Sequence, residues 1–276
     1  MSSPAATPTT GPATDRPDVP ALVVDAVSVA FAGLKALDDV SFTVAPGSIH
    51  AVIGPNGAGK STTFNVLSGV YAATSGTVRF GDTTLTGMRP HKIARLGIAR
   101  AFQNIALSKG QTVAENLMLG RHALTKAGII TSGLRLPGAT REGKRHGDRV
   151  REIADFVGLG DKLDQPAGLL SYGDQKRVEV ARALSCEPRL LLLDEPVAGM
   201  NSDEKARMAG LIAELRRELG ISIVLVEHDM GLVMGISDRV TVLDFGRRIA
   251  DGTPEQVQND PEVVRAYLGT GDEVDA

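Results

Sequence analysis

The sequence is short of the residues on which several classes of protein depend. Its 276 residues include one cysteine and no tryptophan, and aromatic residues make up 4%. A single cysteine excludes a disulfide framework and a zinc site built from several cysteines, and few aromatics argue against a surface on which bases stack. The formal net charge is only −3, from 30 basic and 33 acidic residues. This balance excludes a nucleic-acid binder that depends on bulk positive charge.

Long apolar runs are absent too. Residues 61–78 carry no charge over 18 positions, but they include serine, threonine and asparagine, whereas a membrane span needs about 20 predominantly apolar residues. The first residues lack the basic start and the apolar stretch of a secretory signal peptide. We therefore expect a protein that stays in the cytoplasm. If it works at a membrane, another subunit must hold it there.

The chain begins with a segment of unusual composition. Residues 1–20 hold five of the 14 prolines among serine, threonine and alanine, so this segment buries too little apolar surface to offset the entropy of ordering and is predicted to be a disordered tail. Alternating apolar and polar residues then predict strands at 27–31 and 40–44, which we expect in an antiparallel sheet. Residues 49–53 read as a buried strand.

The second half of the chain is typical of an α/β protein. Apolar strands at 190–193 and 221–226 flank a helical stretch at 204–219, which predicts a strand–helix–strand unit of a parallel sheet. Between the two halves, residues 106–168 have a helical pattern. Within that region, residues 121–149 carry seven basic residues and two acids. This basic stretch fits either a surface facing a partner or a solvated helix and turn.

Residues 54–61 form the motif G-x-x-x-x-G-K-[ST] in full. The motif follows the strand ending at Ile53 and precedes a predicted helix at 60–67, which is the context it requires. Glycines let the backbone N–H groups surround a phosphate, and the following helix presents its positive end to the anion. Lys60 can reach the β- and γ-phosphates, and the Ser61 hydroxyl can ligate Mg²⁺. The sequence therefore predicts a site for a nucleoside triphosphate.

Two carboxylates, Asp194 and Glu195, follow the apolar strand at 190–193. The carboxyl ends of parallel strands form the crevice where such sheets bind ligands. Beside a phosphate loop, Asp194 would hold Mg²⁺, and Glu195 would orient and deprotonate the attacking water. The alternative is an ordinary strand end with solvated acids.

Residues 170–174 read Leu-Ser-Tyr-Gly-Asp and precede a predicted helix at 175–185. Ser171 and Asp174 have the spacing of a capping box, which would make this segment simply the start of a helix. The other interpretation is functional: Ser171, the backbone of Gly173 and the positive end of the helix would bind a second phosphate.

The order of these motifs resembles that of the ATP-binding cassette (ABC) ATPases. The phosphate loop, Gln103, the segment 170–174 (usually LSGGQ in that family), the Asp194-Glu195 pair and His228 follow one another as in the family. The resemblance covers residues 22–268. It implies an α/β fold with a P-loop NTPase core, an antiparallel β subdomain and a helical subdomain. We expect the ATP-binding domain at 21–270, the helical subdomain at about 106–185, and tails at 1–20 and 271–276.

The resemblance also implies a role for each matching residue. His228 would contact the γ-phosphate, and Gln103 would contact Mg²⁺ or the water and couple to a transmembrane subunit, so the expected catalytic set is Glu195, His228 and Gln103. Phe31 would stack on adenine, although it could instead be a core residue of its strand. The expected metal ligands are Ser61, Gln103 and Asp194. The expected nucleotide-binding residues are Phe31, Gly54, Asn56, Gly57, Ala58, Gly59, Lys60, Ser61, Thr62, Ser171 and Gly173.

In the family, the signature binds the ATP held by the phosphate loop of a second cassette, so a single cassette is an incomplete site. Two departures affect this part of the resemblance. Asp174 stands where the signature has glutamine, and Asn201 replaces an acid in the loop Ala-Gly-Met-Asn at 198–201.

One branch of the family is especially similar: the ATPases of branched-chain amino-acid (LIV-type) importers. The similar stretches are 100–105 with 112–117, 170–184, and 226–239 with 252–255. We expect an ATPase that uses ATP and Mg²⁺ and powers uptake of a small solute, first of all branched-chain amino acids. Its partners would be two transmembrane permease subunits, a second ATPase subunit and, indirectly, a solute-binding protein, with no nucleic acid. It would be cytoplasmic and peripheral on the inner face of the cell membrane.

The motifs leave other transported substrates and other roles open. Urea and amide importers share much of the pattern, and a lipopolysaccharide transporter has the same fold. A soluble ABC ATPase that drives no transport, such as one for iron–sulfur assembly, belongs to a different functional class.

Overall fold

The computed structural model describes residues 19–101, 105–121, 124 and 137–268. The strands are β1 (Leu22–Phe31), β2 (Leu34–Val44), β3 (Ile49–Ile53), β4 (Ser75–Phe80), β5 (Thr83–Thr84), β6 (Ile98–Ala101), β7 (Leu190–Asp194), β8 (Ser222–Val226), β9 (Arg239–Asp244) and β10 (Arg247–Gly252). The helices are α1 (Lys60–Leu67), α2 (Pro90–Arg95), α3 (Val113–Arg121), α5 (Pro137–Phe156), α6 (Tyr172–Leu184), α7 (Ser202–Leu219), α8 (Met230–Ile236), α9 (Pro254–Gln258) and α10 (Pro261–Leu268). Two short 3-10 turns, η2 (Gly160–Lys162) and η3 (Ala167–Leu169), precede α6.

The larger sheet has six strands in the order β10-β9-β3-β8-β7-β6. All neighbours pair in parallel except β10, which runs antiparallel to β9 at one edge. The loops that follow β3, β7 and β8 therefore leave the sheet at the same edge, the one formed by the carboxyl ends of the parallel strands. This edge is where a doubly wound sheet binds its ligands.

The strand β7 shows why the centre of this sheet reads as a continuous apolar run. Leu190 and Leu192 pack on one face of the sheet, in the core formed with α1 and the smaller sheet. Leu191 and Leu193 pack on the other face, in the core formed with the helices α3, α5, α6 and α7. All four side chains are fully buried. A parallel strand covered on both faces has no polar side, so the sequence does not alternate.

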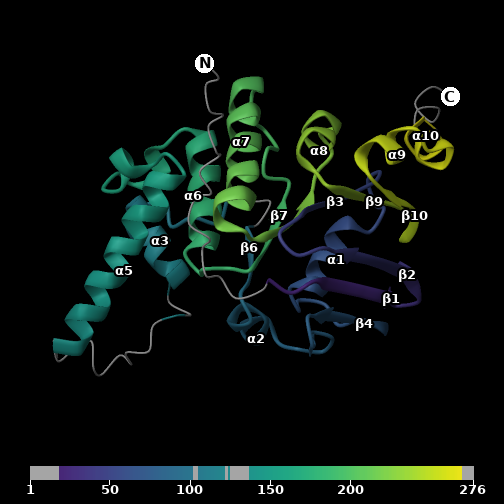
Figure 1. The fold of residues 1–276 in the computed structure, drawn as a ribbon, viewed down its shortest axis with the longest axis horizontal. Coiled ribbons are helices and arrows are strands. Elements are labelled where there is room, and N and C mark those ends of the chain that lie inside the picture. The colour runs from purple at the N-terminus through teal and green to yellow at the C-terminus, as the bar shows by residue number, and fades with distance from the viewer. Residues whose placement is uncertain (1–18, 102–104, 122–123, 125–136, 269–276) are drawn as a thin grey trace, which may run out of the picture.

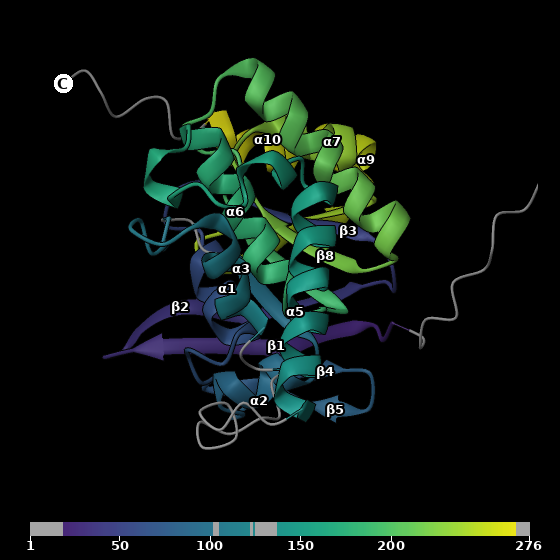
Figure 2. The ribbon, with the colours of Figure 1, turned by 90° about the vertical axis from the view of Figure 1, so that its left-hand side faces the viewer.

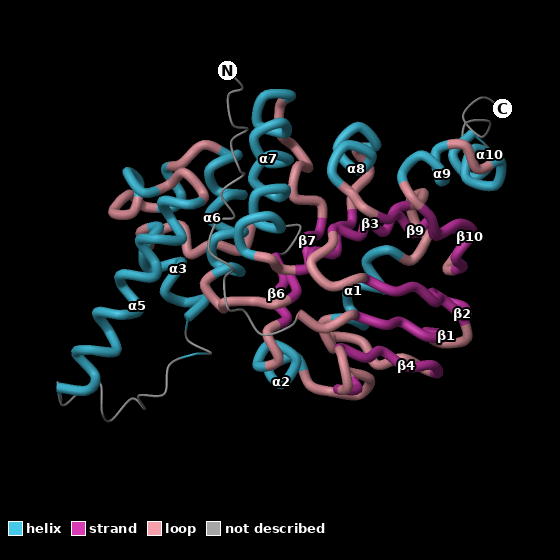
Figure 3. The backbone as a smooth tube through the Cα atoms, in the orientation of Figure 1, coloured by secondary structure: helices cyan, strands magenta, loops and turns pink. Residues whose placement is uncertain are grey.

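The smaller sheet has the order β2-β1-β4-β5, with every pair antiparallel. The helix α1 lies between the two sheets in Figure 1 and Figure 3, and its Phe64 is fully buried in the core that they share. The start of α1 is thereby fixed beside the loop that follows β3.

The helices α3, α5 and α6 lie together at one side of the larger sheet, with α5 in front of the sheets in Figure 2. Val113, Leu117, Ala154 and Val178 join these helices in one apolar cluster. A third cluster packs α8, α9 and α10 against β3 and β9. Within the described part of the chain, no helix is both long and apolar enough to cross a membrane.

Most strand and helix predictions are confirmed. The strand 49–53 and the helix 60–67 have the predicted bounds, and β7, α7 and β8 form the predicted parallel unit. Two helix starts were predicted too late. α6 begins at Tyr172, directly after its N-cap residue Ser171, and α7 begins at Ser202, after its N-cap residue Asn201. In both cases the capping side chain sets the start of the helix.

Some predictions concern residues outside the described part. The predicted tails lie mostly there, because residues 1–18 and 269–276 are not described. Of the basic stretch at 121–149, residues 137–149 belong to α5, while 122–123 and 125–136 are also outside.

Candidate phosphate-binding and catalytic site

The phosphate loop after β3 has a shape that only glycine permits. Gly54 has φ 150° and Gly59 has φ 101°. A Cβ on Gly54 would lie 2.1 Å from the carbonyl oxygen of Leu243, and a Cβ on Gly59 would lie 2.7 Å from Leu37 and 2.8 Å from the carbonyl oxygen of Ala36. Gly54 and Gly59 are therefore required for packing against β2 and β9 as well as for phosphate access.

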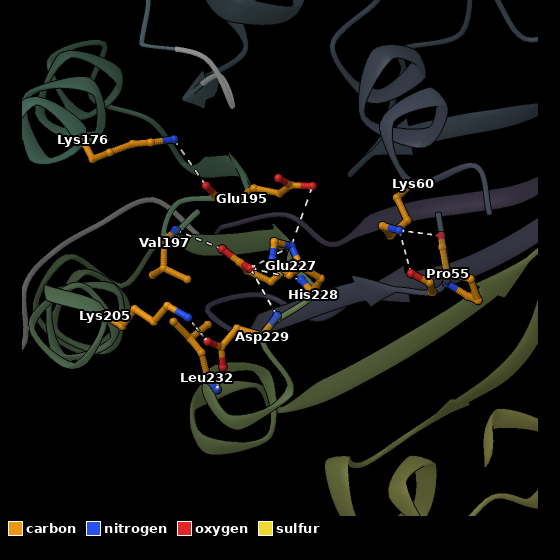
Figure 4. Close-up of polar contacts among 11 residues, drawn as sticks. Pro55, Lys60, Lys176, Glu195, Val197, Lys205, Glu227, His228, Asp229 and Leu232 are labelled. Carbon is orange, nitrogen blue, oxygen red and sulfur yellow. Dashed lines mark hydrogen bonds and ion pairs between the residues drawn. The ribbon is translucent and has the colours of Figure 1, made fainter. Parts of the chain in front are cut away.

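The side chain of Lys60 folds back over the loop that precedes it (Figure 4). Its Nζ donates to the carbonyl oxygens of Gly54 at 2.6 Å and Pro55 at 2.7 Å. Burial lowers the pKa of Lys60, while the charges of Glu195 and Asp194 oppose the shift. The ammonium group thus interacts electrostatically with both carboxylates.

The first turn of α1 is open to an anion. Its N-cap residue is Gly59, which has no side chain to cap the helix, so the first N–H groups have no side-chain acceptor at that position. Ser61 and Asn56 are exposed, and Thr62 is partly buried. The buried Ala58 donates its N–H to the carbonyl oxygen of Pro55 at 3.2 Å.

Asp194 ends β7 and is only 5% exposed. Its Oδ2 accepts a hydrogen bond from Nη2 of Arg100 at 2.7 Å. Nη1 of Arg100 also donates to Asn65 Oδ1 at 2.8 Å and Ser68 Oγ at 3.1 Å, both close to the end of α1. Arg100 therefore holds the carboxylate of Asp194 in place and compensates its charge. This role of Arg100 was not predicted from the sequence.

Glu195 follows Asp194 with a positive φ of 47°, which is unusual for a residue with a side chain. Its N–H donates to the carbonyl oxygen of Val226 at 2.9 Å. Its Oε1 lies 4.0 Å from Nδ1 of His228, and the imidazole is 65% exposed (Figure 4). The structure therefore brings Glu195 and His228 together at the open edge of the sheet. Backbone strain of this kind is concentrated at functional sites.

Phe31 ends β1 and is 45% exposed. This exposure contradicts the alternative that Phe31 is a core residue. Its ring meets that of Tyr71 edge to face, with the centroids 5.1 Å apart. Tyr71 thus supports the aromatic side chain expected to stack on adenine, and it is a second residue that the sequence analysis missed.

The signature segment begins α6. Ser171 is the N-cap, and its Oγ accepts a hydrogen bond from the N–H of Asp174 at 3.2 Å. The carboxylate of Asp174 does not return to Ser171 as a capping box would require. It pairs with Lys162 at 2.7 Å and with Arg177. Burial opposes ionisation of Asp174, but the hydrogen bonds and charges of Lys162 and Arg177 outweigh it and hold its pKa below the usual value.

The signature packs against the loop 198–201 and the start of α7. A Cβ on Gly199 would lie 3.2 Å from the ring of Tyr172, and a Cβ on Gly173 would lie 2.7 Å from Oε1 of Glu204. A small cavity beside Ser171 and Gly173 is otherwise lined by residues of α6, by Met200 and by α7. Ser171 and Gly173 thus lie at the start of α6, whereas Lys60 lies at the start of α1.

Gln103 lies outside the described residues, between Ala101 of β6 and Ile105. The segment that follows it is held firmly. Glu179 of α6 accepts the N–H of Ala106 at 2.8 Å, and Oδ1 of Asn116 accepts the N–H of Ser108 at 2.9 Å.

Tyr267 of α10 is a further contact to the phosphate loop. Burial raises the pKa of Tyr267 to about 12, while the backbone of Gly54 opposes the shift. The last described helix is thus in contact with the nucleotide site.

Comparisons with known proteins agree with this geometry. A family model described as ABC transporter matches residues 37–198, which is more than half of the chain. The chain belongs to the ABC transporter family. A second model, described as branched-chain amino acid ATP-binding cassette transporter, matches residues 247–273.

Two relatives and one solved structure illustrate the similarity. The high-affinity branched-chain amino acid transport ATP-binding protein LivG of Escherichia coli (strain K12) is 44% identical over 91% of this chain and 98% of its own length. The corresponding protein BraF of Pseudomonas aeruginosa is 40% identical over 91% of this chain and 98% of its own length. A crystal structure of the ADP conformation of an ATP-binding cassette of an ABC transporter is 32% identical, with a TM-score of 0.79, over 92% of this chain and 100% of that chain. The predicted fold class and ATPase activity are confirmed: the chain is an ATP-binding, ATP-hydrolysing transporter subunit.

The ion pairs of Asp174 lead to a pH-dependent prediction. Asp174→Asn should lower the free energy of unfolding at pH 7 by about 1–3 kcal/mol, because Lys162 and Arg177 lose a charged acceptor. A depressed native pKa stabilises the fold above the unfolded value of 3.8 and loses this effect as the pH falls below it. The difference from the wild type should therefore shrink as the pH is lowered from 7 towards 3.

Urea unfolding at several pH values measures this difference, with the exposed Asp82→Asn as a control that should match the wild type throughout. An Asp174→Asn effect of constant size across that pH range would show that the ion pairs do not stabilise the fold as described.

Proposed function

We propose that the chain is the ATP-hydrolysing subunit of an importer of branched-chain amino acids. The observation that carries this proposal is its 44% identity over nearly the whole length of LivG, together with the match of residues 247–273 to the branched-chain amino acid model. The alternatives, a urea or amide importer, a lipopolysaccharide transporter or a soluble ABC ATPase, have no comparable support here. The proposed ATP-binding domain spans 21–270, with a helical subdomain at about 106–185.

The site supports a division of roles. The loop 54–59, Lys60 and Thr62 would bind the phosphates, and Phe31 would stack on the base. Ser61, Asp194 and Gln103 offer hydroxyl, carboxylate and amide oxygens, the ligands that Mg²⁺ prefers. Bound Mg²⁺ supplies neutralising charge on the β- and γ-oxygens.

For the chemical step, Glu195 would take a proton from the attacking water. His228 would contact the γ-phosphate, since its exposed imidazole lies beside the carboxylate of Glu195. The side chain of Gln103 would complete this catalytic set.

We propose that two cassettes close head to tail around ATP. Ser171 and Gly173 lie at the N-terminus of α6, in a different part of the molecule from Lys60. The two halves of a phosphate site can therefore meet only when a second subunit, either a copy of this chain or a sister ATPase, presents its signature to this phosphate loop.

A groove on the side of α2, α3 and α6 is the proposed contact for the permeases. It is lined by apolar residues of three segments, including Ile93 and Ala94 of α2, Leu119 of α3 and Ala183 of α6. Arg100, which contacts Asp194, also lines it. Through Arg100 the groove is connected with the nucleotide site, and we propose that the permease contact also includes the segment from Gln103 to Asn116. We propose that the subunit is thereby held at the inner face of the cell membrane. A solute-binding protein would act on it only indirectly, through the permeases.

The catalytic roles can be separated by two substitutions. Glu195→Gln should lower kcat by about 10²–10⁴-fold with little change in ATP affinity, because it removes the base but leaves the phosphate contacts. Lys60→Ala should mainly weaken ATP binding, because it removes the positive charge that contacts the β- and γ-phosphates. Steady-state hydrolysis and equilibrium nucleotide binding measure the two effects. Wild-type turnover in Glu195→Gln would show that another group is the base.

ATP should drive association of the cassettes. With Glu195→Gln to prevent turnover, ATP should increase the hydrodynamic mass to that of a dimer, and Ser171→Ala in the same chain should weaken this shift. The measurement is light scattering after size exclusion, with and without nucleotide. A monomer under all conditions, combined with fast wild-type hydrolysis, contradicts a shared site.

Transport tests both the substrate and the coupling. In vesicles that contain the two permeases and the sister ATPase, the wild-type chain should support ATP-dependent uptake of leucine but not of urea. Gln103→Ala should reduce uptake much more than ATP hydrolysis, because it removes the side chain that would couple the nucleotide to the permease. A nucleotide can move a neighbouring subunit only as far as it discriminates between two conformations.

Cysteines introduced at Thr112 and Glu115, in the proposed permease contact, should cross-link to a permease loop. Glu255 and Glu262, on α9 and α10, provide control positions on another part of the cassette. Cross-links from the control positions alone would place the contact elsewhere, and uptake of urea without leucine would overturn the substrate.

A further inference from the structure

Glu227 is a fully buried carboxylate directly after β8. Its Oε1 accepts the backbone N–H of Val197 at 3.0 Å, and its Oε2 accepts the N–H groups of His228 at 3.1 Å and Asp229 at 3.4 Å (Figure 4). A buried carboxylate is costly unless hydrogen bonds compensate it. Here both oxygens are used, and each oxygen binds a different segment of the chain.

The two segments that Glu227 joins come from neighbouring strands. Val197 lies between Glu195 and the start of α7, whereas His228 and Asp229 lie between β8 and α8. A second link has the same direction: Nζ of Lys205 on α7 pairs with Oδ2 of Asp229 at 2.7 Å. The segment that carries His228 is thus held to the segment that follows Glu195 at two points, one buried and one partly exposed.

A buried cation of α6 interacts with this carboxylate. Lys176 is 2% exposed, and its Nζ donates to the carbonyl oxygen of Glu195 at 3.4 Å. Burial lowers the pKa of Lys176, and the carboxylates of Glu179, Glu227, Glu195 and Asp194 oppose the shift. Glu227 therefore contributes to a compensated group of charges behind the site.

We propose that Glu227 is a positioning residue for ATP hydrolysis, which fixes the backbone of His228 to the segment 197–201 so that the imidazole stays beside Glu195. The inference rests on the proposed role of His228 and names a residue on which that role depends. Because Glu227 joins the two segments, a second cassette that displaces residues 197–201 would also displace His228.

The chemistry of the three contacts gives a sharp substitution. The three hydrogen bonds of Glu227 all come from backbone N–H donors, so the site needs an acceptor at both oxygens. Nδ1 of His228 also lies 3.8 Å from Oε2, so Glu227 faces the imidazole as well as the backbone of His228. Glutamine has almost the same shape but carries one oxygen and one NH₂ group. In either orientation of the amide, an N–H donor of the side chain faces an N–H donor of the backbone. Glu227→Gln should therefore loosen one of the two segments without creating a cavity.

Glu227→Gln should lower kcat for ATP by about 10- to 100-fold, the effect of a displaced catalytic group, with KM for ATP within about threefold of the wild type. The decisive measurement is the same substitution in His228→Ala. If Glu227 acts through His228, it should lower kcat there by less than about twofold, because coupled residues are not additive.

Asp238→Asn is the matched control. Its Oδ2 accepts the N–H of Ile49 at 2.8 Å, so it is also a carboxylate that binds a backbone N–H, but at the start of β3, away from the site. This variant should keep the wild-type kcat. If Glu227→Gln fails to fold, Lys205→Met opens the second link and should show the same lack of additivity with His228→Ala, with a smaller effect.

Three results would overturn the inference: a wild-type kcat in Glu227→Gln, a change in KM alone, or an equal loss of kcat with and without His228. A wild-type kcat in His228→Ala contradicts the proposed role of His228 itself. It then also overturns the inference that Glu227 acts by positioning His228. Absence of ATP hydrolysis by the wild-type chain contradicts the proposed function instead, so the failures can be distinguished.

Discussion

The parallel pairing of β3, β8 and β7 is the constraint on which the site depends. Val226 at the end of β8 pairs with Val52 of β3 on one side and with Asp194 of β7 on the other. The register therefore brings the phosphate loop, the two carboxylates and His228 to one edge of the sheet. The hydrogen bond from the N–H of Glu195 to the carbonyl oxygen of Val226 extends this pairing one residue beyond β7. A slip of one residue would turn every side chain to the opposite face.

Charge compensation is the second condition for such a site. Asp194 and Glu195 lie close to each other, and Arg100 binds the more deeply buried one. The charges of both carboxylates oppose the lowering of the pKa of Lys60, although Lys60 lies on a different element. A bound triphosphate would add negative charge here, so the cations must be in place before it binds. Electrostatic preorganisation of this kind lowers the cost of reorganisation during the reaction.

The sequence predicted those parts of the fold and site that are encoded locally. Residues 49–61 contain a buried strand, a glycine loop and a helix start in succession, so their structure follows from neighbouring residues. Arg100 could not be found in this way, because its partner Asp194 is 94 positions away. For the same reason the pairing of Phe31 with Tyr71 and of Glu227 with Val197 depends on strand order, which local periodicity does not determine. The ion pair between Asp174 and Lys162 was also not predicted, because Lys162 lies in a short turn before α6.

The departures from the family pattern are related to one another in space. The tyrosine within the signature, Tyr172, packs where a side chain at residue 199 would lie, so it requires Gly199 in the neighbouring loop. Asn201 caps α7 through its Oδ1, which accepts the N–H of Glu204 at 3.0 Å. Asparagine caps a helix about as well as aspartate. The replacement therefore keeps the start of α7 but removes a negative charge, while Asp174 adds one that Lys162 and Arg177 neutralise. Both changes leave the helix starts beside the proposed phosphate contact intact without adding uncompensated negative charge.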